Sequence, residues 1–191
     1  MRLHLVPVVT AALAALAFGG PAPRAQTAYR IDPAHSEIVY SMSHPAHSWT
    51  GESHQVSGSL TVRGAAVTGG TVQAPVQSFT SGNRNRDSHM AETTESYLYP
   101  TVTFEAQTVT TLPAAERTAE QNATVRGVLT FHDVARPVTV PVRIDVSGGR
   151  AHLTGSFDVT ITEFGMDRPS LLGIKTRDWI GLRLNLVARP A

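Results

Sequence analysis

Four histidines of this 191-residue chain carry side chains that could hold a metal ion. His44, His47 and His54 lie in or beside one polar segment, and His89 lies in a later one. Side chains three positions apart on a regular strand point to opposite faces, so His44 and His47 converge only if the chain bends at Pro45. A zinc site needs three or four converging ligands, and no cysteine or acidic residue stands at ligand spacing here. Metal binding is therefore the minority hypothesis, and solvated loop histidines are the simpler interpretation.

Arg86 and Asp87 form the second group that could do chemistry. Neighbours on a helix diverge by about a hundred degrees, so the two side chains do not pair with each other. Asp87 suits the first turn of a helix, where a carboxylate caps free N–H groups, and Arg86 would then tie the helix to the rest of the fold. The functional alternative is that Arg86 contacts a phosphate or another polar group of a ligand.

The patterns expected of an enzyme are missing from the sequence. There is no cysteine nucleophile, no Gly-x-Ser-x-Gly elbow and no phosphate-binding loop. His35 and Ser36 are adjacent, but a catalytic triad is recognised by its geometry in space and not by neighbours in sequence. We therefore expect no catalytic residues and no enzyme activity.

The first residues predict export. Residues 1–18 contain one arginine followed by a run rich in Leu, Val and Ala, and a Gly- and Pro-rich stretch follows. This is typical of a secretory signal peptide, which we place at residues 1–25, with cleavage after Ala22 or Ala25. The alternative is an uncleaved anchor, although the apolar run is short for a membrane span. We expect a periplasmic or secreted protein without stable membrane insertion, and the lack of cysteine rules out disulfides and a lipidated N-terminal cysteine.

The remaining chain, residues 26–191, has the composition of one β domain. Removing residues 1–25 takes away two arginines and no acidic residue, which leaves 14 Lys and Arg against 15 Asp and Glu. Nucleic acid is therefore not expected as a partner, because its binding requires clustered positive charge. The chain favours Val and Thr, punctuated by Gly and Pro, which is a β composition.

Alternation of apolar and polar residues predicts eight strands and one helix. The strands are expected at about 35–44, 56–62, 71–79, 101–110, 124–131, 137–146, 153–161 and 180–186. Turn-forming residues at 80–83 precede a helix at about 86–97, with Asn85 or Asp87 as its cap. Tyr99-Pro100 ends that helix, because the residue before proline is pushed out of the helical region. The His- and Ser-rich segment between the first two strands is expected to be a loop.

Eight antiparallel strands with one apolar face each are buried most simply by an up-and-down barrel, which also removes exposed edges. A sandwich is the alternative. Gly58, Gly127 and Gly155 fall on inward positions, where they either leave space for a ligand or relieve strand curvature. An eight-stranded barrel is wide enough to be filled by side chains or to hold one elongated ligand.

Several motifs resemble the YceI-like family. The longest comprises Thr80, Gly82, Asn83, Arg86, Asp87, His89 and Met90, followed by Tyr99-Pro100 and Phe104. The others are residues 29–36, 127–130 and 163–166, and they occur in the same order over residues 29–189. The resemblance implies a lipocalin-like barrel domain at 26–191 that binds polyisoprenoids or other long-chain lipids.

We therefore expect a carrier that holds a long apolar molecule inside the barrel, such as a polyisoprenoid, an isoprenoid quinone or a fatty acid or amide. Arg86 would meet its polar end. The apolar residues expected to hold it are Ile38, Tyr40, Met42, Phe79, Phe104, Leu129, Phe131, Phe157, Leu171 and Leu172. No covalent cofactor is expected, and a homodimer is left open. The alternatives are a metal- or redox-linked stress protein that uses the histidine loop, and a barrel filled by its own side chains.

Overall fold

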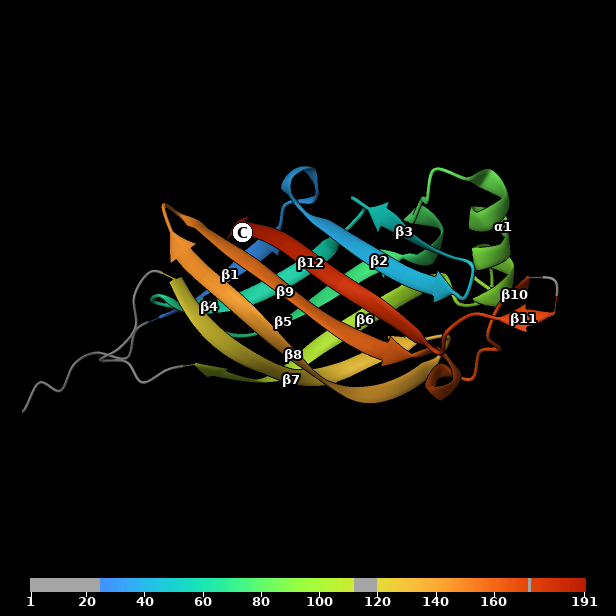
Figure 1. Ribbon diagram of the computed structural model, residues 1–191. Helices are drawn as coiled ribbons and strands as arrows, with labels where there is room; N and C mark the ends of the chain where they lie inside the picture. The colour runs from blue at the N-terminus through green and yellow to red at the C-terminus, as the bar shows by residue number, and fades with distance from the viewer. Residues whose placement is uncertain (1–24, 112–119, 172) are drawn as a thin grey trace, which may run out of the picture.

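The computed structural model describes residues 25–111, 120–171 and 173–191, and within these ranges ten strands form one antiparallel sheet (Figure 1). The predicted signal peptide lies outside the described residues except for Ala25. The strands of this sheet are β1 (Gln26–Ile31), β2 (Glu37–His44), β3 (His47–Ser53), β4 (Ser57–Arg63), β5 (Ala66–Pro75), β6 (Thr101–Thr111), β7 (Glu120–Phe131), β8 (Val134–Ser147), β9 (Arg150–Thr160) and β12 (Trp179–Pro190). A separate short hairpin joins β10 (Ser170–Leu171) to β11 (Ile174–Lys175).

The sheet closes into a barrel because β12 pairs with strands from both ends of the chain. On one side β12 pairs with β2 and, through its last residues, with β1, and on the other side it pairs with β9 from Trp179 to Ala188. The short 3-10 helix η1 (Pro33–His35) separates β1 from β2, and residues 54–56 separate β3 from β4. Each of these pairs therefore acts as one broken strand, and the ring contains eight. Neighbours in sequence are neighbours in the sheet, which confirms the up-and-down barrel.

Two strands of the barrel, β1 and β3, were not expected from the sequence, nor was the short β10–β11 hairpin. The His- and Ser-rich segment forms β3, which pairs with β2 from Ile38↔Ser53 to His44↔His47, so its prediction as a loop was wrong. Its inward positions alternate Trp49, Gly51 and Ser53, which is too weak an apolar signal to predict a strand. β1 is exposed along most of its length and is held by backbone pairing to β4 and β12.

The helix α1 spans Arg84–Thr93, earlier than the predicted 86–97. Asn83 is its cap, because its side-chain oxygen accepts a hydrogen bond from the Arg86 backbone N–H at 3.2 Å. The prediction of Asn85 or Asp87 as the cap was therefore wrong. Asn83 has an extended backbone that lets the helix begin at the next residue. The helix stops early because Glu95 takes a left-handed conformation with φ 44°.

The three inward glycines serve the backbone rather than a cavity. A Cβ atom on Gly58 would lie 2.0 Å from the Thr71 carbonyl oxygen, and one on Gly127 would lie 2.3 Å from the Glu105 carbonyl oxygen. A Cβ on Gly155 would lie 2.7 Å from the Pro141 carbonyl oxygen. These positions therefore allow neighbouring strands to approach closely where the barrel curves, and the alternative that they leave ligand space was wrong.

Asp32 fastens the seam where β1 meets β12. One carboxylate oxygen accepts a hydrogen bond from the Ala34 N–H at 3.1 Å and caps η1. The other oxygen accepts from Arg189 Nε and from His35 Nδ1, both at 2.9 Å. The hydrogen bond from Arg189 is the main cause that holds the pKa of Asp32 below its usual value, against the opposing effect of burial.

This seam predicts an acid-dependent stability. A carboxylate whose pKa is lower in the folded state stabilises the fold above its unfolded pKa, and this is lost as the pH falls through the folded pKa. Asp32→Asn is therefore expected to lower the melting temperature at neutral pH, and the two melting temperatures should converge as the pH falls through the lowered pKa of Asp32. Thermal melts from pH 7 to pH 2.5 measure this, and a constant difference across the range would contradict it.

Candidate functional site

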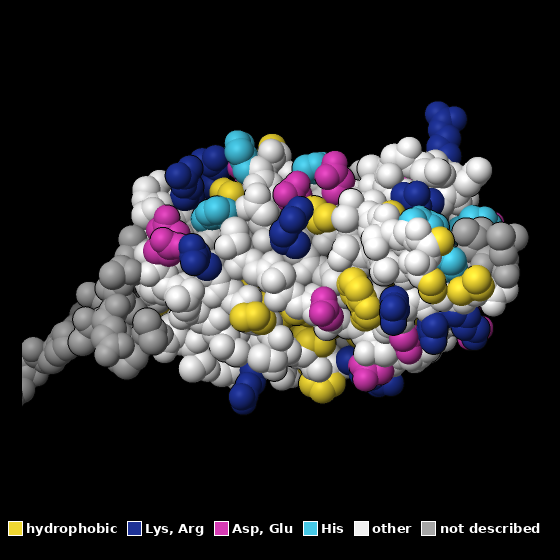
Figure 2. Space-filling view, viewed as in Figure 1, with side chains coloured by type: hydrophobic (Ala, Val, Ile, Leu, Met, Phe, Trp, Pro, Cys, Tyr) yellow, Lys and Arg dark blue, Asp and Glu magenta, His cyan; other side chains and the backbone are white. Residues whose placement is uncertain are grey.

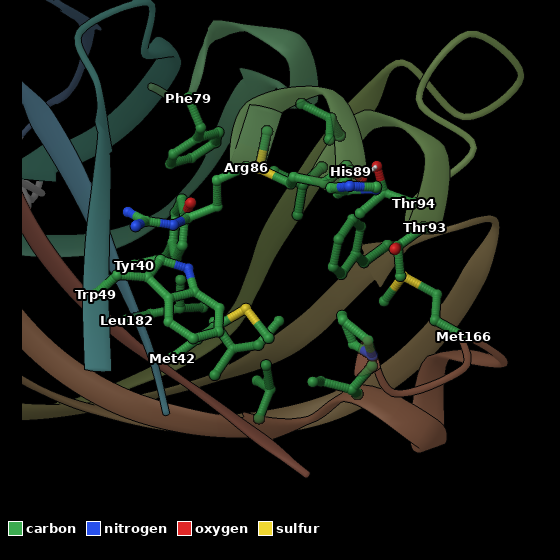
Figure 3. Close-up of a pocket in the computed structure, with 18 of the residues that line it drawn as sticks. Tyr40, Met42, Trp49, Phe79, Arg86, His89, Thr93, Thr94, Met166 and Leu182 are labelled. Carbon is green, nitrogen blue, oxygen red and sulfur yellow. Dashed lines mark hydrogen bonds between the residues drawn. The ribbon is translucent and has the colours of Figure 1, made fainter. Parts of the chain in front are cut away.

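The candidate site is a pair of apolar chambers inside the barrel, of which the outer one lies beneath α1 (Figure 3). The outer chamber has a volume of about 150 Å³ and the inner chamber a volume of about 110 Å³. The outer chamber is walled by α1, the segment after β5, both strands of the β2–β3 hairpin and the ends of β6, β7, β9 and β12. Its few polar residues are Arg86, His89, Thr93 and Thr94, all on or next to α1.

The two chambers meet at one ring of residues. Phe79, Val102, Leu129 and Leu182 line both the outer and the inner chamber. Phe79 and Leu129 are buried, and the other two are partly buried against the core. The barrel interior is therefore partitioned at this level rather than open from end to end.

Most residues expected to hold a ligand lie on these walls. Tyr40, Met42, Arg86 and Phe131 line the outer chamber. Ile38, Phe104 and Phe157 line the inner chamber, and Phe79 and Leu129 line both. Leu172 lies outside the described residues, and Leu171 belongs to β10 but its side chain is not among those described. Ligand binding by these residues stays a prediction.

The sequence interpretation overlooked several residues of the outer wall. Trp49 was missed because its strand was taken for a loop, and the sequence offered no strong signal for that strand. Met90 and Met166 line the outer chamber and belong to the motifs at 80–90 and 163–166, so the motifs themselves pointed to them. Leu182 stands on the predicted inward face of the last strand and was not assigned to the site.

Arg86 closes one side of the outer chamber over an aromatic ring. Its guanidinium carbon lies 5.4 Å from the centre of the Trp49 ring, which is a cation–π contact. Tyr40 lies on the same wall, and its ring covers Gly51, where a Cβ would meet the ring at 2.3 Å. Burial, followed by the nearby Asp87 carboxylate, raises the pKa of Tyr40 against the opposing effect of Arg86. Tyr40 therefore presents a neutral hydroxyl to this part of the site.

Asp87 joins α1 to the turn that precedes it. One carboxylate oxygen accepts from the Ser81 backbone N–H at 2.9 Å and from Ser81 Oγ at 2.6 Å, and the other accepts from Thr80 Oγ1 at 3.2 Å. Burial raises the pKa of Asp87, but these hydrogen bonds outweigh it and the pKa is lowered overall. Asp87 thus organises the turn rather than capping the helix.

Asp87→Ala is expected to lower the free energy of unfolding by about 1–2 kcal/mol, because it removes hydrogen bonds to a charged group that is partly shielded from water. The pKa of Asp87 is lower in the folded state, so its contribution is present at neutral pH and is lost as the pH falls through that folded value. Urea unfolding at pH 7 and at pH 3 measures both effects. A loss that is equal at the two pH values would contradict this role.

The end of α1 is held by a second polar contact. His132, in the turn between β7 and β8, lies 2.8 Å from Glu95 Oε2 through Nε2 and 3.2 Å from the Phe164 carbonyl oxygen through Nδ1. Both contacts are hydrogen bonds only when the ring carries both protons. The Tyr99 ring packs edge-on against His132 at 4.4 Å between centroids. The helix that covers the outer chamber is therefore held by Asp87 in its first turn and by Glu95 just after its end.

The bend at Pro45 brings His44 and His47 together, with their ring centroids 5.6 Å apart, but the four histidines considered for a metal do not form one ligand group. His44 is buried, and both ring nitrogens contact the backbone, Nδ1 with the Ala46 N–H and Nε2 with the Ile174 carbonyl. His47 packs between the rings of His44 and Trp49. His89 lies on α1 beside Glu92.

One different group among the described residues could hold a metal ion. It consists of Glu37, Glu52 and His54, whose ligand atoms lie within 4.8 Å of one another. Glu52 lies near the end of β3, His54 directly follows that strand, and Glu37 begins β2. The prediction that no acidic residue stands at ligand spacing was therefore wrong, because Glu52 lies two residues before His54 and the pairing of β2 with β3 brings Glu37 beside them. Two of the three residues are exposed, and the group lies outside both chambers.

The surface seen in Figure 2 shows basic and acidic side chains interspersed, without a continuous patch of one sign on that face. Among the described residues, no helix is long and apolar enough to span a membrane.

A closed up-and-down barrel of eight strands, with a helix over one end and an apolar interior, defines a lipocalin-like barrel of the kind that holds one small ligand. The YceI-like domain matches residues 29–188, and the chain belongs to this family.

Solved structures share this fold at low sequence identity. Burkholderia cenocepacia BcnA is 21% identical, with a TM-score of 0.69 over 82% of this chain and 98% of that chain. A polyisoprenoid binding domain from Saccharophagus degradans, implicated in plant cell wall breakdown, is 13% identical, with a TM-score of 0.67 over 86% and 99%. A Campylobacter jejuni YceI protein is 14% identical, with a TM-score of 0.56 over 100% and 99%. No curated protein sequence matches this chain significantly.

Proposed function

We propose that this protein is an exported carrier that binds one long apolar lipid inside the barrel and is not an enzyme. The ligand class is a prenyl chain, such as a polyisoprenoid or an isoprenoid quinone, with a fatty acid or amide as the related alternative. The observation that carries the proposal is the outer chamber, whose walls are apolar except for the α1 side. Membership of the YceI-like family and the name of the Saccharophagus degradans domain support the prenyl class.

The arrangement suits a lipid with one polar end. An apolar chain gains about 0.8 kcal/mol for each methylene removed from water, and the inward aliphatic and aromatic side chains provide such surroundings. The polar end would lie near Arg86, whose guanidinium is held by Trp49 at the side of the outer chamber. Orientation then follows from chemistry, with the polar end outward and the tail directed inward.

The test is ligand uptake by delipidated protein. Protein purified, extracted with organic solvent and refolded is mixed with a prenyl alcohol, an isoprenoid quinone or a fatty acid, and complexes are counted by native mass spectrometry. The proposal expects one ligand per chain, with a preference for the prenyl ligands. Failure to retain any prenyl or acyl chain would reject the carrier function. Amino-terminal sequencing of protein from the exported fraction tests export separately, with the new terminus expected at residue 23 or 26.

The metal-linked alternative has one specific observation in its favour, which is the group of Glu37, Glu52 and His54. His54 Nδ1 contacts the Ser36 carbonyl oxygen at 3.3 Å, and Nε2 lies 3.9 Å from Glu52 Oε1, so the Nε2 lone pair and the Glu52 carboxylate could bind one cation. Metal analysis of the purified protein, compared with organic extraction of the same sample, separates this function from lipid binding. One metal ion per chain that is lost in Glu52→Gln would favour the metal-linked function. One lipid per chain in the organic extract would favour the carrier function.

A further inference from the structure

The partition between the two chambers includes the Phe79 side chain, whose backbone is held by hydrogen bonds on both sides. Phe79 follows the 3-10 helix η2 (Val76–Ser78) and precedes the turn into α1. The backbone of Thr80 exchanges two hydrogen bonds with Glu52, each 2.9 Å long, and Val76 N–H donates to the Pro100 carbonyl at 2.8 Å. Ser78 Oγ contacts Ser53 Oγ at 2.6 Å. The backbone that carries Phe79 is therefore pinned on both sides, and its side-chain torsions are the freedom that remains.

The Phe79 ring differs from the other three residues of the partition. Val102, Leu129 and Leu182 stand on β6, β7 and β12, where alternation fixes the direction of each side chain. Phe79 stands outside the strands, is 9% exposed and packs edge-on against Tyr40 at 5.9 Å between centroids. Figure 3 shows the ring directed into the outer chamber. The Phe79 ring therefore stands where the two chambers meet.

Resting on the proposed function, we propose that Phe79 is a partition that sets the length of chain the protein retains. A short chain occupies the outer chamber alone, with its polar end at the α1 side. A longer chain reaches the inner chamber only after the Phe79 ring turns away from its resting position and gives up its contact with Tyr40. The ligand class that follows is a prenyl or acyl chain long enough to use both chambers, and its affinity includes the cost of moving the ring.

The test compares chain lengths across matched variants. The probes are all-trans prenyl alcohols of two to six isoprene units, and their dissociation constants are measured by Trp fluorescence, since Trp49 lines the outer chamber. Phe79→Ala removes the partition. Met166→Ala changes a residue of the outer chamber only, and Leu184→Phe narrows the inner chamber only.

The expected result depends on length. Phe79→Ala should weaken binding of the shortest alcohol, because the variant loses part of the outer wall. Relative to the shortest alcohol, it should strengthen binding of the longest by on the order of tenfold, because the cost of a displaced rotamer and one aromatic contact is removed. Leu184→Phe should weaken binding of the long alcohols alone, and Met166→Ala should weaken binding of every length. If Phe79→Ala does not fold, Phe79→Leu should show the same trend with a smaller amplitude.

Two outcomes would overturn the inference. One is a Phe79→Ala effect that is the same for all chain lengths, which would make Phe79 an ordinary wall residue. The other is unchanged affinity of Leu184→Phe for the longest alcohol, which would mean that the inner chamber is not used. Both require that the unchanged protein binds the probes, so they are distinct from failure of the carrier function, in which no length binds.

Discussion

Phe164→Ala is expected to lower the free energy of unfolding by about 3–5 kcal/mol, the usual cost of truncating a fully buried Phe. Phe164 is 1% exposed and ends the 3-10 helix η4 (Ile161–Phe164) at the end of the barrel beneath α1. Its ring packs against Phe131 at 5.8 Å between centroids, and its carbonyl oxygen accepts from His132. Urea unfolding measures the loss, and the melting temperature should fall by roughly 6–20 °C.

Two variants accompany this measurement. Phe164→Leu keeps most of the buried volume and should cost less than about 1.5 kcal/mol. Phe131→Ala removes the partner ring, which is only partly buried and lines the outer chamber. This variant should lower the free energy of unfolding less than Phe164→Ala does, and it should weaken ligand binding more. Phe164 lines neither chamber. If Phe164→Ala lowered the free energy of unfolding by less than about 1 kcal/mol, the packing of η4 against the barrel would not contribute to stability as expected.

Arg86→Ala is expected to increase the dissociation rate of a bound lipid by roughly tenfold, because the variant loses one partly shielded cation–π contact. Arg86 covers the side of the outer chamber formed by Trp49 and belongs to α1, which lies over that chamber. Without the Arg86 side chain, α1 loses a contact to the β2–β3 hairpin, while the Asp87 hydrogen bonds to Ser81 remain. Stopped-flow displacement of a fluorescent fatty acid measures the rate.

Controls on the same helix separate the charge from the contact. Arg84→Ala removes an equal charge from an exposed position that does not line the chamber, and should leave the rate unchanged. Arg86→Lys keeps the charge but loses the planar guanidinium, so an intermediate rate is expected. An Arg86→Ala variant with an unchanged dissociation rate and a melting temperature lowered as much as in Asp87→Ala would assign Arg86 a structural role only.

The family motifs acquire physical roles in the tertiary structure. Asp32 of the first motif joins η1 to Arg189 at the barrel seam, and Asn83 of the longest motif caps α1. Phe164 of the late motif is buried beside His132. The motifs therefore mark the places where the regular strand pattern is interrupted and side chains must stabilise the backbone.

Alternation in the sequence predicted most of the strands and most of the inner wall, while the short connections and the family resemblance favoured a barrel over a sandwich. Runs such as Leu153 to Ile161 place apolar side chains on one face because successive residues of a strand point to opposite sides. That rule is local, so the wall positions of Ile38, Phe104 and Leu129 could be expected without knowledge of the strand order. The helix was located by its turn formers and by Pro100, and only its cap and bounds were displaced.

Contacts between distant segments were decided by the tertiary structure alone. β1 and β3 carry weak apolar patterns and are strands because their backbones pair with β12, β4 and β2, and such pairing does not depend on side-chain type. The same pairing brings Glu37 beside His54 and places Trp49 under Arg86. The division of the interior at Phe79 also arises only when β6, β7 and β12 surround it. Register between strands fixes these neighbours, and register is a property of the closed barrel.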